Sequence, residues 1–260
     1  MATRAVDALR LHTMYVRDRA GGGPPIVILH GGWGYEFYPF DDALAQLPNR
    51  FVIPDRTGYG KSVPPVRETL PRGFHAMYAR ETEGLLDELG ISRCVLWGHS
   101  DGAVIAVHLA TRNPERYAGV VLEALHLDRE KPRSREFFTR MAKDPDAFGE
   151  RVTARLAAEH GPSWRTIIRA DGEAWLDIAA TPELDMFDGR LGALRMPTLV
   201  LHGECDPRTE PGELDRLRHE VPHAEIHMLE QGQHAPHSER ATAATCTQIV
   251  ARWLSVLPMP

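Results

Sequence analysis

Short apolar runs recur along the chain and predict buried β-strands. The clearest runs are closed by turn residues and lie at residues 25–30, 51–54, 94–97 and 198–203. Continuous apolar runs of this length are typical of strands that are buried on both faces of a sheet. Further strands are expected at residues 118–125 and 224–229, with one or two edge strands within residues 9–17.

Segments with helical spacing of apolar residues separate these strands. They lie at residues 41–47, 75–89, 103–110 and 238–257. Because strands alternate with helices, the fold class is α/β, with a mostly parallel sheet and helices on both faces.

Residues 126–194 have a different character from the rest of the chain. Charged and aromatic residues mix there at helical spacing, prolines interrupt them, and no strand-like run occurs. A segment of this length between two strands indicates an inserted unit. We therefore expect a core made of residues 1–125 and 195–260, with residues 126–194 as a helical cap insertion.

Composition excludes several classes of protein. The chain has 260 residues, a formal net charge of −6 and no basic run, which argues against a nucleic-acid partner. No apolar stretch is long enough to span a membrane, and charged residues interrupt the first ten positions, where a signal peptide is apolar. Three widely spaced cysteines are typical of reduced thiols. We expect a cytoplasmic protein without a membrane partner; no signal in the chain indicates an oligomeric state.

The pattern G-x-S-x-G stands between the apolar strand at 94–97 and the apolar helix at 103–110, as Gly98, Ser100 and Gly102. A sharp strand-to-helix turn places a serine hydroxyl at the sheet edge and requires glycines, because a Cβ there would collide with neighbouring backbone. The following helix N-terminus favours a developing oxyanion. Ser100 is therefore the candidate nucleophile, and a helix N-cap is the structural alternative.

A serine hydroxyl needs a base to remove its proton and a third group to orient that base. Asp206 follows the strand at 198–203, and His234 follows the strand at 224–229. Both therefore fall at the carboxyl ends of strands, where an open α/β sheet binds its ligands. His237 is an alternative base, and Glu204 and Glu123 are alternative acids.

Several of these segments together resemble the α/β-hydrolase superfamily across nearly the whole chain. The matching segments are His-Gly-Gly at 30–32, the Asp-Arg-Thr-Gly-Tyr-Gly-Lys-Ser run at 55–62, the serine turn at 98–102, Gly-Glu-Cys-Asp at 203–206 and Gly-Gln-His at 232–234. In turn, the resemblance implies an oxyanion loop, a structural turn, a nucleophile elbow, a triad acid and a triad base. In that family the cap selects the substrate.

The oxyanion hole is expected to use the backbone N–H groups of Asp101 and Gly32, with Trp33 as the alternative to Gly32. The Asp101 side chain is expected to point away, into the turn or solvent. His234 and His237 have no accompanying cluster of Asp, Glu or Cys, so no metal and no cofactor is expected.

Aromatic side chains near these motifs suit an apolar acyl or aromatic group. The candidate substrate-binding residues are Trp33, His99, Phe137, Trp164 and Trp175. Arg165 and Arg169 form an (i, i+4) pair that offers a cationic edge, although such a pair is more often a solvated helix face.

The leading hypothesis is a serine hydrolase that cleaves an ester, thioester or lactone of a small molecule through an acyl-enzyme. A C–C bond hydrolase, an amidase or a cofactor-free perhydrolase would share this architecture. From another class, a non-catalytic ligand receptor with a hydrolase fold remains as an alternative. A dehalogenase is disfavoured because that chemistry needs a carboxylate at the position of Ser100.

Overall fold

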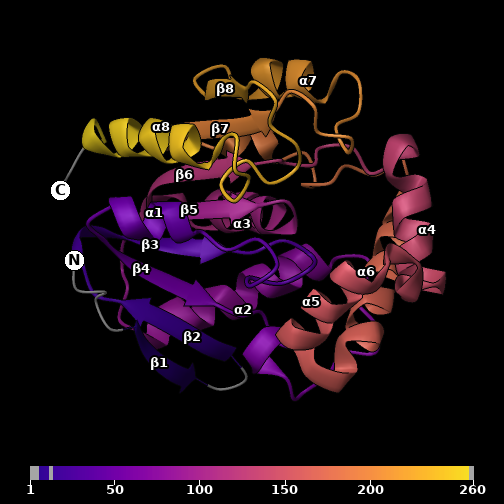
Figure 1. Cartoon of the computed structure of the whole chain (residues 1–260). Helices are drawn as coiled ribbons and strands as arrows, with labels where there is room; N and C mark the ends of the chain where they lie inside the picture. The colour runs from indigo at the N-terminus through magenta and orange to yellow at the C-terminus, as the bar shows by residue number, and fades with distance from the viewer. Residues whose placement is uncertain (1–5, 12–13, 258–260) are drawn as a thin grey trace.

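A computed structural model describes residues 6–11 and 14–257 of the chain. Its strands form one eight-stranded sheet in the order β1-β2-β4-β3-β5-β6-β7-β8 (Figure 1). β1 and β2 pair antiparallel, as do β2 and β4, and the remaining pairs are parallel. The predicted fold class is confirmed. The strands are β1 Val6–Leu11, β2 Met14–Arg19, β3 Gly22–Leu29, β4 Asn49–Pro54, β5 Cys94–His99, β6 Tyr117–Glu123, β7 Thr198–Gly203 and β8 Glu225–Leu229.

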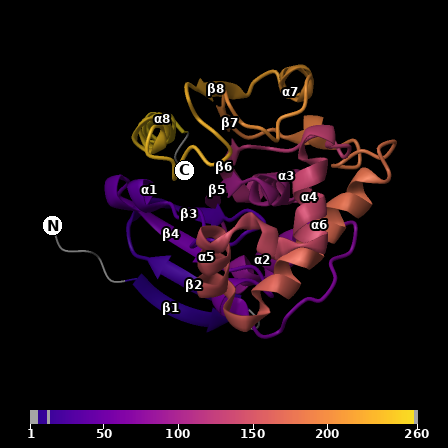
Figure 2. The ribbon, with the colours of Figure 1, turned by 45° about the vertical axis from the view of Figure 1, so that its right-hand side comes forward.

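Helices cover both faces of the sheet, as the alternating pattern predicts. α1 and α8 contact each other over one face, and α2 and α3 contact each other over the opposite face (Figures 1 and 2). The helices are α1 Asp41–Gln46, α2 Phe74–Glu88, α3 Asp101–Arg112, α4 Arg135–Lys143, α5 Glu150–His160, α6 Trp164–Ala179, α7 Glu213–Glu220 and α8 Ala243–Ser255.

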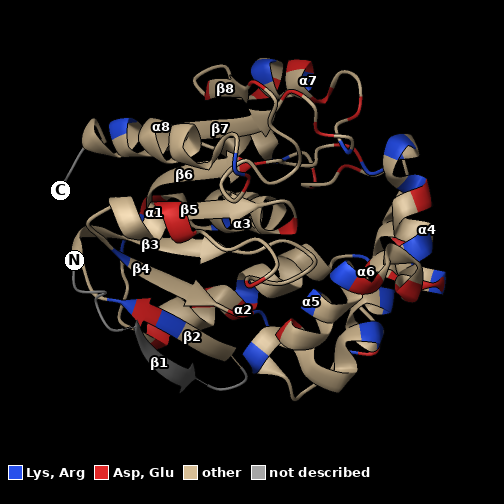
Figure 3. Cartoon of the chain, viewed as in Figure 1, with Lys and Arg blue, Asp and Glu red and all other residues tan. Residues whose placement is uncertain are grey.

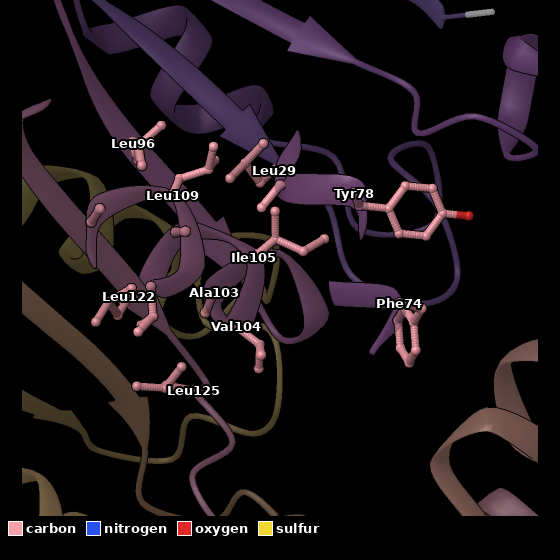
Figure 4. Packing of buried hydrophobic residues seen from close by; sticks show 14 of the residues in the cluster. Leu29, Phe74, Tyr78, Leu96, Ala103, Val104, Ile105, Leu109, Leu122 and Leu125 are labelled. Atoms are coloured by element: carbon pink, nitrogen blue, oxygen red, sulfur yellow. The ribbon is translucent and has the colours of Figure 1, made fainter. Parts of the chain in front are cut away.

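The apolar run of β3 shows why the central strands lack an alternating pattern. Ile26 and Ile28 belong to the core cluster that includes α8, whereas Val27 and Leu29 belong to the cluster that includes α3. All four side chains are at most 2% exposed. Successive side chains of a strand point to opposite faces, so a strand covered on both sides is apolar throughout. Figure 4 shows Leu29 beside Ile105 of α3.

Residues 126–194 contain α4, α5 and α6, and no strand lies among these described residues. The three helices lie beyond the carboxyl ends of the parallel strands (Figures 1 and 2). Charged residues are frequent on the outside of these helices and scarce on β3, β5 and β6 (Figure 3). We refer to residues 126–194 as the helical segment.

The last helix begins later than its apolar spacing predicts. It was expected from residue 238, but α8 begins at Ala243. The Glu239 carboxylate instead accepts hydrogen bonds from the N–H groups of Gln233 (2.6 Å) and Ala235 (2.7 Å). Thr242 Oγ1 donates to the Pro236 carbonyl at 2.8 Å. These bonds close the loop that carries His234. Glu239 and Thr242 therefore belong to this loop and precede the helix.

The three cysteines are free thiols; Cys94 and Cys246 are buried and Cys205 is exposed. Within residues 6–11 and 14–257, none of the helices combines the length and the apolar character needed to cross a bilayer.

A buried ion pair fixes the loop that follows β6. Lys131 Nζ lies 2.7 and 2.8 Å from the two carboxylate oxygens of Glu213, the first residue of α7. The same carboxylate accepts hydrogen bonds from the N–H groups of Leu127 (2.8 Å), Asp128 (2.9 Å) and Glu210 (2.7 Å). A buried charge with this many donors is costly to unpair, because its partners have no access to water. The pair therefore ties the start of the helical segment to the core.

We predict that Glu213→Gln lowers the free energy of unfolding by about 3–5 kcal/mol, because it leaves the Lys131 ammonium buried and unpaired. Chemical denaturation measures the loss. Asp215→Asn on the same helix is the matched control, since Asp215 pairs with Arg218 on the exposed surface, and its expected cost is below about 1 kcal/mol. Equal losses in the two variants would contradict the assignment.

Candidate active site

Ser100 occupies a strained turn between β5 and α3. Its φ is 55° and its ψ is −121°, a conformation that is rare and costly for a residue with a side chain. Hydrogen bonds on both sides hold it: Ser100 N–H donates to the Glu123 carbonyl at 2.9 Å, and its own carbonyl accepts from Ala103 N–H at 2.8 Å. The surrounding backbone therefore imposes the conformation that projects the serine at the sheet edge.

The two glycines of the motif are required by close backbone contact. A Cβ on Gly98 would lie 2.2 Å from the carbonyl oxygen of Gly102, and a Cβ on Gly102 would lie 1.9 Å from that of Leu29. Both distances are far below van der Waals contact. The G-x-S-x-G spacing thus reflects the tight approach of α3 to β3 and β5.

Ser100, His234 and Asp206 are hydrogen-bonded in series. Ser100 Oγ lies 3.0 Å from His234 Nε2, and His234 Nδ1 lies 2.9 Å from Asp206 Oδ2. Asp206 follows β7, and His234 lies in the loop after β8. Because an ionised carboxylate only accepts hydrogen bonds, His234 Nδ1 carries the proton and Nε2 is the acceptor for the serine hydroxyl.

Burial and neighbouring charge set the protonation states of this series. Burial, with the nearby Arg208 cation, lowers the pKa of His234 to about 4, although Asp206 opposes the shift. Burial alone would raise the pKa of Asp206, but the charge and hydrogen bond of His234 outweigh it and lower that pKa below its usual range. At neutral pH the series therefore contains a neutral imidazole and an ionised carboxylate.

The alternative acid and base form a pair of their own. His237 Nδ1 lies 2.7 Å from Glu123 Oε1, and His237 Nε2 lies 2.9 Å from the Tyr38 carbonyl oxygen. Both ring nitrogens of His237 are therefore occupied, and Glu123 also accepts from Trp97 Nε1 at 3.2 Å. The other alternative acid, Glu204, is exposed.

Gly32 and Asp101 are the residues whose backbone N–H groups are expected to form the oxyanion hole. Both residues line the same pocket as Ser100. Neither amide donates a hydrogen bond to another described residue. Asp101 is the first residue of α3, where the helix leaves its N–H groups unsatisfied. Both amides are thus without a hydrogen-bond acceptor among the described residues.

The sequence analysis expects the Asp101 side chain to point into the turn or solvent. The structure shows a different orientation. It is buried, and its Oδ1 accepts hydrogen bonds from Trp175 Nε1 at 3.0 Å and His75 Nε2 at 3.2 Å. Arg56 Nη2 lies 3.6 Å from Oδ2. The expectation was wrong because these donors lie on α2, α6 and the loop after β4, which chain order does not place beside Asp101.

A second buried carboxyl, Asp171 of α6, lies against Gly32 and Asp101. A Cβ on Gly32 would meet Asp171 Oδ2 at 2.2 Å and Asp101 Oδ2 at 3.0 Å. Burial and the neighbouring Asp101 carboxylate raise the pKa of Asp171 well above its usual range. For Asp101, burial is outweighed by His75 and Arg56, and its pKa is lowered. The two shifts run in opposite directions, so Asp171 holds a proton more readily than Asp101 does.

A pocket of about 380 Å³, open to solvent at its mouth, adjoins Ser100. Of the substrate-binding candidates, it brings together Trp33, His99, Phe137 and Trp175. Trp164 is buried at the start of α6 and is not among the lining residues. Three further lining residues, Tyr38, Phe138 and Met141, were not among the candidates although their segments were. The lining residues that sequence reasoning missed are His126, Asp171 and Arg208.

His126 is the most notable of the missed residues. Its Nε2 lies 3.4 Å from Ser100 Oγ, and its ring stacks on that of His234 with centroids 5.6 Å apart. Burial, with the Lys131 cation, lowers the pKa of His126 well below its usual range. Its place just after β6, a neighbour of the serine strand, is the signal that could have found it.

His99 has a structural contact in addition to its place at the pocket. Its Nε2 lies 2.9 Å from the His234 carbonyl oxygen. The two candidate arginines of α6, Arg165 and Arg169, do not line the pocket. Arg165 instead binds the exposed Asp146, at 2.7 and 2.8 Å. Among residues with described side chains, no three His, Cys, Asp or Glu groups gather as a metal site requires.

Comparison with known proteins agrees with this architecture. Residues 26–247 match the model of the alpha/beta hydrolase family. Over 90% of the chain, the sequence is 27% identical to "Serine hydrolase BPHL" of Mus musculus, of which it covers 79%. It is 28% identical to an "Epoxide hydrolase" of Caballeronia sordidicola over 69% of this chain and 57% of that protein.

A solved structure of a thermophilic esterase from Thermogutta terrifontis is similar in fold. The TM-score is 0.70 at 20% identity, and the match covers 93% of each chain. The family match, which spans most of the sheet and its helices, confirms the resemblance inferred from the motifs. The chain belongs to the alpha/beta hydrolase family.

Proposed function

We propose that the protein is a serine hydrolase that cleaves an ester, thioester or lactone of a small molecule. The observation that carries the proposal is the series of hydrogen bonds from Ser100 Oγ to His234 Nε2 (3.0 Å) and from His234 Nδ1 to Asp206 (2.9 Å). A serine hydroxyl beside a neutral, oriented imidazole is the arrangement that acyl transfer requires.

In the proposed mechanism, Ser100 Oγ attacks the carbonyl carbon of the substrate while His234 Nε2 takes its proton. Asp206 holds the imidazole in the required tautomer and stabilises its charged form. His234 then donates the proton to the leaving group. A water molecule, deprotonated by His234, attacks the acyl-enzyme and releases the acid and free Ser100.

The tetrahedral intermediate carries a negative charge on the former carbonyl oxygen. The unbonded N–H groups of Gly32 and Asp101 support an oxyanion hole at this position, and each such donor contributes about 10²–10³ to the rate in enzymes of this kind. The ionised Asp101 side chain would repel a nearby oxyanion. This repulsion is reduced because Arg56, His75 and Trp175 face the carboxylate.

The helical segment supplies much of the pocket wall, through Phe137, Phe138 and Met141 of α4 and Trp175 of α6. We propose that it acts as a cap that selects the substrate, with an apolar part of the substrate against these side chains. A C–C bond hydrolase, an amidase or a perhydrolase would use the same serine. An epoxide hydrolase or dehalogenase reaction is disfavoured, because Ser100 stands where a carboxylate nucleophile is needed.

Ser100→Ala is expected to lower kcat/KM for a short-chain ester by at least about 10⁴-fold, because no other hydroxyl of a described residue is hydrogen-bonded to His234 Nε2. Hydrolysis of p-nitrophenyl butyrate measures the loss. Ser255→Ala, at the exposed end of α8, is the control and should retain full activity. Turnover by Ser100→Ala at the wild-type rate would exclude the mechanism. A ligand that the wild type binds specifically, with no ester turned over, would favour a receptor.

The pH dependence follows from the lowered pKa of His234, which is about 4. The imidazole must be neutral to accept the serine proton, so activity should be present above this pKa and lost below it. We expect kcat/KM for a neutral ester to be level from pH 7 down to about pH 5, and to fall to half near pH 4. Circular dichroism at each pH separates this loss from unfolding. A midpoint near 6.5, the ordinary histidine value, would contradict the described environment.

A further inference from the structure

Arg208 lines the pocket beside Ser100 and lies two positions beyond Asp206 in the chain. Its backbone N–H donates to Asp206 Oδ1 at 2.9 Å, which fixes the loop. Its guanidinium carbon lies 4.1 Å from the centroid of the Phe137 ring, and the residue lines the pocket together with His234. A guanidinium that stacks on an aromatic face keeps its N–H edges free for an acceptor.

Apart from the Phe137 ring, the Arg208 side chain has no partner among the residues whose side chains the structure describes. Among those residues, no carboxylate lies within salt-bridge distance of it and none accepts a hydrogen bond from its guanidinium. Other arginines contrast with it: Arg17 pairs with Asp55 at 2.6 Å, and Arg165 pairs with Asp146 at 2.7 Å. A half-buried cation without a partner lies against the pocket.

The imidazoles that line the pocket add no charge at neutral pH. Burial lowers the pKa of His99 to about 3 and that of His234 to about 4, and it lowers the pKa of His126 well below its usual range. All three rings are therefore neutral when the enzyme would operate.

Neither of the two lining carboxyls forms an ion pair with Arg208. Burial and the neighbouring Asp101 raise the pKa of Asp171, and the Asp101 carboxylate has Arg56 at 3.6 Å. The negative charge of Asp101 thus has its own cation. Arg208, the cation that lines the described pocket, forms no ion pair, and the nearby Asp206 carboxylate is instead bound to the His234 ring and to the Arg208 backbone N–H.

We propose that Arg208 forms a subsite for a carboxylate carried by the substrate, so that the enzyme acts on esters, thioesters or lactones that bear a second, anionic group. This inference rests on the proposed hydrolase function and names its substrate class. A guanidinium fork binds a carboxylate through two parallel hydrogen bonds. The apolar wall formed by Phe137, Phe138 and Met141 suits the short carbon chain between that carboxylate and the scissile carbonyl.

Three methyl esters of matched length test the subsite: monomethyl adipate, methyl hexanoate and methyl 6-aminohexanoate, which are anionic, neutral and cationic at pH 7. We expect the wild-type kcat/KM for the anionic ester to exceed that for the neutral ester by roughly 10- to 100-fold, as for a charge-assisted hydrogen bond. Arg208→Met should reduce this ratio to near one, and Arg208→Lys should keep part of it. The ratio cancels any effect of Arg208 on His234 that all esters share.

Arg165→Met is the matched control, because Arg165 is exposed, paired with Asp146 and outside the pocket lining. It should leave the ratio of the two esters unchanged. A wild-type preference for the neutral or the cationic ester, or a ratio unaffected by Arg208→Met, would overturn the subsite.

Binding separates the subsite from the hydrolase function. Calorimetric titration of Ser100→Ala with monomethyl adipate should show binding that is weakened roughly 10- to 100-fold by adding Arg208→Met. Charge-dependent binding without turnover by the wild type would support the subsite and refute the proposed hydrolysis. Turnover of all three esters with binding insensitive to Arg208→Met would do the reverse.

Discussion

The close approach of α3 to the sheet is the constraint on which the site depends. A Cβ on Gly102 would lie 1.9 Å from the Leu29 carbonyl oxygen, so the first turn of α3 rests on the end of β3 without an intervening side chain. Between β5 and this turn, Ser100 has a strained conformation with φ of 55°. The strain is held by a buried core on both sides of the sheet and projects the hydroxyl beyond the strand ends.

Parallel pairing then brings distant residues to the same edge. β5, β6, β7 and β8 are neighbours in the sheet, and the loops after them carry Ser100, His126, Asp206 and His234. Because the strands run in one direction, their ends meet at one edge of the sheet. Segments more than a hundred residues apart in the chain, such as those of Ser100 and His234, therefore come into contact there. Burial beneath the helical segment keeps the imidazoles neutral, which is the state a general base requires.

The central strands, the glycine turn at Ser100 and the places of Asp206 and His234 after strand ends were predictable from the sequence, because each depends on local pattern: apolar runs for strands buried on both faces, and glycines where backbones touch. Contacts between side chains from distant segments around the pocket could not be predicted from the sequence. The orientation of Asp101 depends on donors from α2 and α6. Arg208 becomes a candidate binding residue only when the structure shows that its guanidinium has no hydrogen bond or ion pair with a described residue. The start of α8 also escaped prediction, because Glu239 bonds to the loop of His234 instead of extending the helix.

The central claim, that Ser100 is the covalent nucleophile, is tested most directly by peptide mapping of the acid-quenched reaction with p-nitrophenyl acetate. Tandem mass spectrometry of the fragment that contains Ser100 and Asp101 distinguishes the two side chains. The account predicts one acetyl group per chain, on the Ser100 oxygen, formed and lost at rates compatible with turnover. An acetyl group on another residue, or heavy oxygen from labelled water in the Asp101 carboxyl, would contradict it.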